Sequence, residues 1–161
     1  MVRGFVWMLS ILAIASLPAT AFAEELVWML SKQKGRPYLT AMPDVSEVDF
    51  EFWARCRADG TIDIGMGAES HVGKGKGERV SLTLASAGQT VTISGVSRES
   101  ANVEMTGGIE LRARVTRDDK LFALLMTGQP ISVTGPIKPL KWEVKGLKAK
   151  VEAFLKGCRK G

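Results

Sequence analysis

The stretch VDFEFWARCRADGTIDIGMG, residues 48–67, decides the fold that we expect for this chain. Apolar and polar residues alternate on both sides of Asp59 and Gly60, which is typical of the two strands of a hairpin. A two-residue turn would place the two apolar rows on opposite faces. A three-residue loop, Ala58–Gly60, instead pairs Cys56 with Ile62 and keeps both rows on one face. The sequence therefore predicts a three-residue hairpin loop with Cys56 pointing into the core.

The rest of the chain predicts further strands and two helices. Alternation indicates a second hairpin over residues 80–93, a strand over 107–115, and short strands at ISVTG (131–135) and KWEV (141–144). DDKLFALLMTG (118–128) is compatible with a doubly buried strand, but a short helix capped by Asp118 and ended by Gly128 fits better. Apolar spacing also predicts a helix over about 147–157. The expected fold is mainly β, an antiparallel β-sandwich or open barrel with a short internal helix and a C-terminal helix.

The first 23 residues have the features of a secretory signal peptide. Arg3 precedes an apolar run of 13 residues, 5–17, and the small residues of AFA at 21–23 suit cleavage. The run is shorter than the roughly 20 residues that a membrane-spanning helix needs. We therefore predict cleavage near Ala23, export to the periplasm or the medium, and one β-rich domain over 24–161 without a transmembrane segment. An uncleaved anchor is the alternative.

The chain contains two cysteines, Cys56 and Cys158. An even number of cysteines in an exported protein favours a disulfide, and only one intramolecular pairing is available here. In the chain-entropy description, a bond that encloses about a hundred residues is worth roughly 4–5 kcal/mol. The sequence therefore predicts a disulfide that attaches the C-terminal helix to the first core strand.

Basic residues are concentrated near the C-terminus. The whole chain has 22 Lys and Arg against 17 Asp and Glu, whereas the segment from Lys138 onward has eight basic and two acidic residues. This asymmetry indicates an anionic partner, and a solvated lysine-rich helix face is the alternative. The candidate contacts are five lysines: Lys138, Lys141, Lys145, Lys148 and Lys150.

The segment SHVGKGKGERV, residues 70–80, alternates glycines with Lys74 and Lys76 and invites comparison with a phosphate-binding loop. Such a loop needs four residues between its first glycine and Gly-Lys, then Ser or Thr, between a strand and a helix. Here five residues separate Gly67 from Gly73-Lys74, and Gly75 stands in place of the hydroxyl residue. Both flanks are predicted strands. The segment is expected to be a mobile connection between hairpins, with its two lysines a secondary candidate for contact with an anionic surface.

The sequence contains no recognisable catalytic or metal-binding constellation. His71 is the single histidine and lies in the segment just described, so a histidine-based metal cluster is impossible. No G-x-S-x-G motif is present, and aromatic residues are not interleaved with basic ones as in many nucleic-acid-binding proteins. We therefore predict a protein that is not an enzyme, with no catalytic residues, metal or cofactor and no nucleic-acid partner. Trp53 faces away from Phe52 and is expected to pack under the N-terminal segment Leu26–Leu30.

The order of these features resembles that of small periplasmic proteins of Gram-negative bacteria of the invasion-associated locus B type. The resemblance rests on the signal peptide, a first strand of the form F-x-F-W-x-x-C at 50–56, the run of hairpins, the short helix before GQPISV (128–133), and the final FLKGC helix (154–158). It implies a non-enzymatic, disulfide-bonded β protein of the cell envelope.

A second resemblance is to periplasmic inhibitors of C-type lysozyme, small β-barrels that begin with a similar strand and cysteine. Those inhibitors carry a Ser-x-x-x-x-Ala-Ser-Gly-x-x-Tyr stretch that enters the lysozyme cleft. The segment SRESANVEMTGG, residues 97–108, has the serines but lacks the tyrosine.

The sequence supports three functional hypotheses. The first is an exported, non-enzymatic binding or structural protein of the envelope that contacts an anionic partner, such as lipid headgroups or lipopolysaccharide, through its basic C-terminal segment. The second is a periplasmic inhibitor of a lysozyme-like enzyme, which requires a protruding loop. The third is a hydrolase, which requires carboxylates that converge on a cleft.

Overall fold

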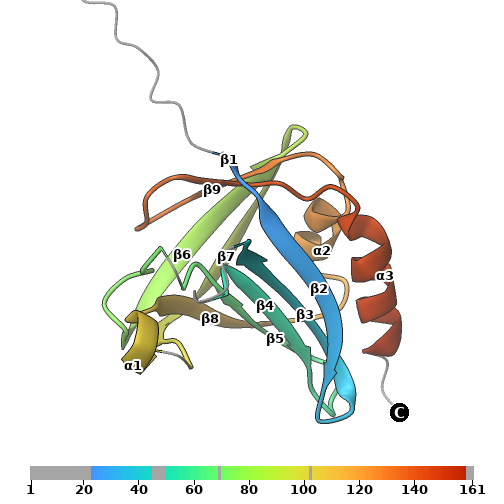
Figure 1. Cartoon of the computed structure of the whole chain (residues 1–161), viewed down its shortest axis with the longest axis horizontal. Helices are drawn as coiled ribbons and strands as arrows, with labels where there is room; N and C mark the ends of the chain where they lie inside the picture. Colours follow the sequence, from blue (N-terminus) through green and yellow to red (C-terminus); the bar gives the residue numbers. More distant parts are fainter. Residues whose placement is uncertain (1–22, 45–49, 69, 102, 159–161) are drawn as a thin grey trace, which may run out of the picture.

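The computed structural model describes residues 23–44, 50–68, 70–101 and 103–158, and they form a mainly β protein (Figure 1). The strands are β1 (Ala23–Glu24), β2 (Leu26–Gln33), β3 (Arg36–Pro43), β4 (Phe52–Cys56), β5 (Ile62–Met66), β6 (Lys76–Ser86), β7 (Gln89–Glu99), β8 (Ile109–Val115), β9 (Ile131–Thr134) and β10 (Leu140–Trp142). The helices are α1 (Val103–Thr106), α2 (Lys120–Leu125) and α3 (Leu147–Gly157). Of the predicted signal peptide, only Ala23 belongs to the described residues.

The strands join one sheet that curls into a nearly closed barrel. Their order is β1-β10-β9-β6-β7-β8-β5-β4-β3-β2, and neighbours are antiparallel except for the parallel pair β1 and β10. Among the two architectures that the sequence allowed, the structure is therefore the open barrel, with the expected internal and C-terminal helices.

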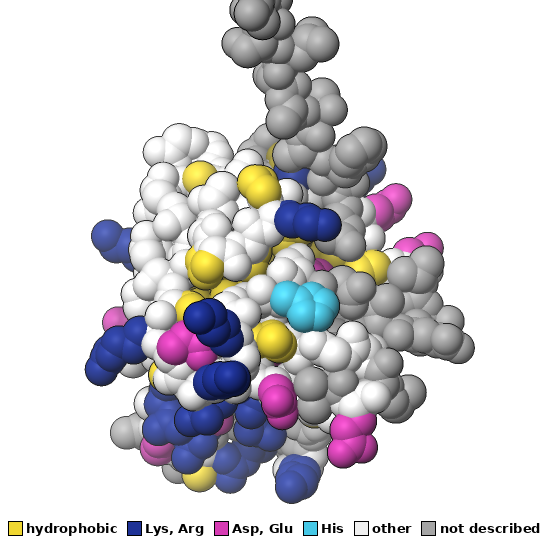
Figure 2. All heavy atoms as spheres, turned by 90° about the vertical axis from the view of Figure 1, so that its left-hand side faces the viewer, with side chains coloured by type: hydrophobic (Ala, Val, Ile, Leu, Met, Phe, Trp, Pro, Cys, Tyr) yellow, Lys and Arg dark blue, Asp and Glu magenta, His cyan; other side chains and the backbone are white. Residues whose placement is uncertain are grey.

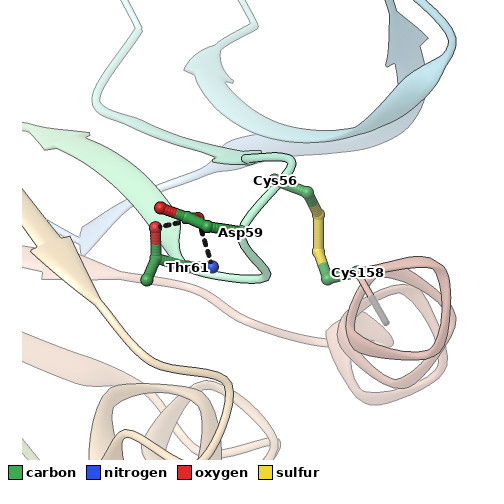
Figure 3. Close-up of a disulfide and its surroundings, with 4 residues drawn as sticks. All are labelled: Cys56, Asp59, Thr61 and Cys158. Atoms are coloured by element: carbon green, nitrogen blue, oxygen red, sulfur yellow. Dashed lines mark hydrogen bonds between the residues drawn. A yellow bond between two sulfur atoms is a disulfide. The ribbon is translucent and has the colours of Figure 1, made fainter. Parts of the chain in front are cut away.

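The β4–β5 hairpin has the predicted register. Cys56 pairs with Ile62 and Phe52 with Met66, so the loop consists of Ala58–Gly60. Gly60 has a φ of 82°, the left-handed conformation that this loop requires. The Asp59 carboxylate accepts hydrogen bonds from the backbone N–H (2.9 Å) and the hydroxyl (2.6 Å) of Thr61, which holds the turn together (Figure 3).

The β6–β7 hairpin pairs Leu84 with Val91, as parity predicts. Its loop consists of Ala87 and Gly88, because Ser86 pairs directly with Gln89. Positive φ values at both loop residues, Ala87 (48°) and Gly88 (74°), are those of a type I′ turn.

The internal helix α2 begins one residue later than predicted. Its N-cap is Asp119, not Asp118, and the Asp119 carboxylate accepts a hydrogen bond from the backbone N–H of Leu121 at 2.9 Å. Asp119 has the extended backbone of an N-cap directly before the first helical residue, which lets its side chain reach the free amides of the first turn.

The core lies inside the curved sheet and is completed by α2 and α3. Helix α3 packs beside β2 and β3, and α2 contacts β7 and α3 (Figure 1). An aromatic cluster of Trp28, Phe52 and Trp142, with ring centroids 5.5–6.3 Å apart, fills the space between β2 and β10. The Trp28 indole N–H also donates to the carbonyl of Glu143 at 3.1 Å. Side chains thus bridge the gap between β2 and β10, which we call the barrel seam.

The predicted disulfide is present. Cys56 at the end of β4 and Cys158 at the end of α3 are both buried, with Cα atoms 5.4 Å apart and 102 positions between them in sequence (Figure 3). The bond therefore attaches the last helix to the strand that opens the first predicted hairpin.

Candidate functional site

The outer face of β3, β4, β5 and β8 gathers charged and aromatic side chains that are distant in sequence. Alternation along β4 buries Phe52, Ala54 and Cys56 and leaves the intervening side chains on the outside. Strand register then places two rows across the four strands. One row is Tyr38, Arg55, Asp63 and Arg114, and the next is Thr40, Trp53, Gly65 and Arg112.

Asp63 lies at the centre of an arginine cluster. Its Oδ2 is 3.0 Å from Arg57 Nη1 and 3.6 Å from Arg55 Nη2, and its Oδ1 is 3.1 Å from Arg114 Nε. Burial alone raises the pKa of Asp63, but the hydrogen bonds from Arg57 and Arg114 outweigh it, so the pKa lies below its usual value. Asp63 is therefore an ionised partner of the guanidinium groups, whereas a general acid needs a raised pKa.

Glu110 fixes the orientation of Trp53. Its side chain is 2% exposed, and its carboxylate accepts hydrogen bonds from Trp53 Nε1 and Arg112 Nε, both at 2.6 Å. A Cβ at Gly65 would overlap both the indole and this carboxylate, so the indole crosses β5 where that strand has no side chain. The prediction that Leu26–Leu30 covers Trp53 is wrong, because β3 separates β2 from β4 in the sheet.

Three adjoining cavities of about 320, 370 and 340 Å³ meet around Arg55 on this face, and we call them together the arginine groove. Arg55 lines all three, and Trp53, Asp63 and Gln33 each line two of them. The basic residues of its wall are Lys34, Arg36, Arg55, Arg57, Arg112 and Arg114, and its acidic residues are Asp63 and Glu110. Figure 2, which views the side where β8 and α1 lie, shows Lys and Arg side chains crowded in the lower part of the molecule.

One end of the groove is aromatic. Tyr38 and Phe50 meet edge to face with centroids 6.3 Å apart, and both line the same cavity as Trp53. The Arg55 guanidinium lies 5.9 Å from the centroid of the Trp53 ring, within cation–π range. Burial, and then the charge of Glu110, raise the pKa of Tyr38, so its hydroxyl stays protonated as a hydrogen-bond donor.

The five C-terminal lysines are less available than their number suggests. Lys150 donates a hydrogen bond to the carbonyl of Trp28 at 2.8 Å and so belongs to the barrel seam. Lys141 lies 3.9 Å from Glu143, and Lys148 lies 3.9 Å from Glu152 on the same helix. Lys138 and Lys145 are exposed.

The glycine–lysine segment, residues 70–80, leads from β5 into β6 and thus connects the two predicted hairpins. It was expected to be mobile, but its backbone is held by hydrogen bonds. The amides of Lys74 and Lys76 both donate to the carboxylate of Glu78, and the amide of Gly75 donates to Ser97 Oγ at 2.7 Å. Gly73 has a φ of 84°, which lets the amides converge. The backbone thus does bind an anion here, and that anion is the chain's own carboxylate, while both lysine side chains point into solvent.

Replacing Glu78 by Gln is expected to weaken the pH dependence of stability. The hydrogen bond from the Lys74 amide is the largest cause of the lowered pKa of Glu78. A carboxyl with a lowered pKa in the folded state stabilises the fold above the unfolded pKa of about 4.3, and this contribution disappears as the pH falls through the folded value. Glu78→Gln should therefore be less stable than the wild type at pH 7 and similar to it at pH 3, as measured by urea unfolding.

The matched control is Lys74→Ser/Lys76→Ser, which keeps both backbone amides and should follow the wild-type pH curve. A Glu78→Gln variant that differs from the wild type equally at both pH values would contradict this account of the turn.

The described ranges, 23–44, 50–68, 70–101 and 103–158, contain neither a metal-binding cluster of side chains nor a membrane-spanning helix. There, no group of three or more His, Cys, Asp or Glu side chains is placed to hold a metal ion. None of the helices in that part of the chain has the length and hydropathy needed to cross a bilayer. The segment compared with lysozyme inhibitors contains the end of β7 and the short helix α1, and its Ser97 is buried, with its hydroxyl donating to the carbonyl of Val72 at 2.7 Å.

The arginine groove was not predicted from the sequence. The signal was present in WARCR and LRARV, where alternation puts Arg55 and Arg57 on one outward face and Arg112 and Arg114 on another. The pairing of β5 with β8 brings the two pairs of arginines together, and local sequence patterns do not reveal this pairing. No protein-family model matches the chain, and no curated protein or solved structure shows significant similarity to it.

Proposed function

We propose that this chain is an exported, non-enzymatic binding protein of the cell envelope that recognises an anionic partner through the arginine groove. The observation that carries the proposal is the set of three adjoining cavities around Arg55, whose walls together have six basic and two acidic residues. The leader-like N-terminus and the Cys56–Cys158 disulfide support export, because disulfides persist in oxidising compartments.

The guanidinium groups suit this role because each has five N–H donors in a fixed fork. Asp63 already shows that they hold an oxyanion, and it uses only some of those donors. Arg55, Arg57 and Arg114 remain 41–55% exposed, so their other donors are open to solvent and to a ligand. Charge-assisted hydrogen bonds of this kind are stronger than neutral ones.

The groove replaces the C-terminal segment as the preferred site. Lys150 is engaged in the barrel seam, and Lys141 and Lys148 each have a carboxylate nearby. Arg55, Arg57 and Arg114 instead line adjoining cavities and all contact Asp63, so several guanidinium groups lie close enough together to share one bound anion.

A charge-matched pair of variants tests this proposal. Arg55→Gln/Arg57→Gln/Arg114→Gln and Lys138→Gln/Lys145→Gln/Lys148→Gln each remove three positive charges. With fluorescein-labelled heparin as the polyanionic probe, the arginine variant should lose at least about 10-fold in affinity, which corresponds to about 1.4 kcal/mol. The lysine variant should lose less than about 3-fold, since exposed lysines contribute little. Wild-type binding should weaken between 50 and 300 mM NaCl because salt screens exposed charges.

Circular dichroism and thermal unfolding would verify that both variants are folded. Equal losses in the two variants would mean that only net charge matters, and a larger loss in the lysine variant would return the site to the C-terminal segment. Absence of wild-type binding at low salt would refute the proposal.

A further inference from the structure

Trp53 is held in one orientation at the edge of the arginine groove. Its indole N–H is bound to the buried Glu110 carboxylate, which is itself held by Arg112 Nε. Arg112 is anchored in turn, because its Nη2 donates to the carbonyl of Glu99 at 2.9 Å. A ring fixed in this way loses little conformational entropy when a ligand packs against it.

Gly65 is the feature that makes this arrangement possible. Glycine inside a strand is destabilising relative to alanine and often marks a close approach of another group. Here a Cβ would overlap Trp53 and Glu110. Strand β5 thus has a glycine at the point where the Trp53 ring lies across it. The same ring lines two of the cavities.

The groove is large as well as charged. Its three cavities, each of about 320–370 Å³, meet around Arg55, and its basic side chains stand on β3, β4 and β8 and on the adjoining loops. The strands that carry the cations, β3, β4 and β8, span three strand spacings of about 4.8 Å each, so the cations are spread over the sheet although Arg55, Arg57 and Arg114 meet at Asp63. Such a surface fits a chain of ring units with repeated anionic groups better than a single small ion.

We infer that the ligand of the arginine groove is an acidic oligosaccharide, with its carboxylates paired to the arginines and one sugar ring packed against Trp53. This inference rests on the proposed function and names its ligand class. Sugar rings present C–H faces that pack on an aromatic ring, and guanidinium forks match carboxylates geometrically. A flat membrane surface meets a recessed groove poorly, and single-stranded nucleic acid requires several open aromatic faces. Tyr38 and Phe50 lie against each other instead.

The test measures binding of hexagalacturonate by titration calorimetry, with maltohexaose as the neutral oligosaccharide, a dT12 oligonucleotide, and phosphatidylglycerol vesicles as the other arms. Hexagalacturonate should bind the wild type and maltohexaose should bind at least about 10-fold more weakly. Trp53→Ala should lower the affinity for hexagalacturonate about 10-fold, whereas Trp53→Phe, which keeps a ring, should lower it less than about 3-fold. Gly65→Ala should resemble Trp53→Ala, although it keeps every polar group of the groove.

The outcomes separate this inference from the proposed function. If the arginine variant loses hexagalacturonate binding while Trp53→Ala and Gly65→Ala bind normally, anion binding stands and the ring contact is refuted. If dT12 or the vesicles bind more tightly than hexagalacturonate, the ligand class is wrong. If none of the three polyanionic probes binds, both proposals fail. Thermal unfolding of each variant identifies any loss that comes from misfolding, and Trp53→Phe then carries the comparison.

Discussion

Cys56→Ser is expected to lower the free energy of unfolding by about 2–5 kcal/mol, and Cys158→Ser by a similar amount. The disulfide closes a loop whose ends are 102 positions apart, so breaking it restores much conformational freedom to the unfolded chain. It also releases the end of α3 from β4, although the buried Leu147, Val151 and Phe154 still hold the helix against the sheet. Urea unfolding followed by circular dichroism measures the change.

The double variant Cys56→Ser/Cys158→Ser provides the control. Either single change already breaks the bond, so the double variant should be about as stable as the single ones instead of losing twice as much. Losses that add, or single losses below about 1 kcal/mol, would mean that the bond contributes little and that each cysteine acts only through its own packing.

Trp28→Ala is expected to lower the free energy of unfolding by about 3–5 kcal/mol, the range for removing a large aromatic side chain from a core. Trp28 is 6% exposed, packs against Phe52 and Trp142, and donates its indole N–H to Glu143 across the seam between β2 and β10. Its loss leaves a cavity at the place where the sheet does not close by backbone pairing. Thermal and urea unfolding should both detect the loss.

Val27→Ala is the matched control on the same strand, because Val27 is 38% exposed and points to the opposite face. It should change stability by less than about 0.5 kcal/mol. Trp28→Phe should lie between the two, since it keeps an aromatic ring and loses the hydrogen bond. A Trp28→Ala variant no less stable than Val27→Ala would show that the seam does not depend on this side chain.

The local parts of the fold were predictable because they depend on parity and turn chemistry. The β4–β5 register follows from keeping Ile62 on the face of Cys56, with Gly60 as the left-handed residue. The choice between sandwich and barrel was not predictable, because it depends on the pairing of β5 with β8 and of β6 with β9, which join segments far apart in sequence. The N-cap of α2 was misplaced by one residue because two aspartates are adjacent and only the backbone decides between them.

The same limit explains the candidate site. A count of charges along the sequence favours the C-terminal lysines, but the fold uses Lys150 as a hydrogen-bond donor to β2. Arg55 and Arg114 are almost sixty positions apart in sequence, and they both contact Asp63 only because β5 pairs with β4 on one side and with β8 on the other. Trp53 was expected to pack under the N-terminal segment. Its actual surroundings, the Glu110 carboxylate and the open backbone at Gly65, could not be foreseen because they belong to other strands.

Contacts between the N-terminal and C-terminal parts of the chain affect the order in which the protein folds. The Trp28–Glu143 and Lys150–Trp28 hydrogen bonds span 115 and 122 positions, and the disulfide spans 102. A ribosome makes β2 early, but its side-chain partners leave the ribosome near the end of synthesis. The barrel seam therefore cannot form while the chain is still growing, and contacts of such long range slow folding. The local β4–β5 and β6–β7 hairpins can form earlier, but the closed barrel exists only once the last helix has been made.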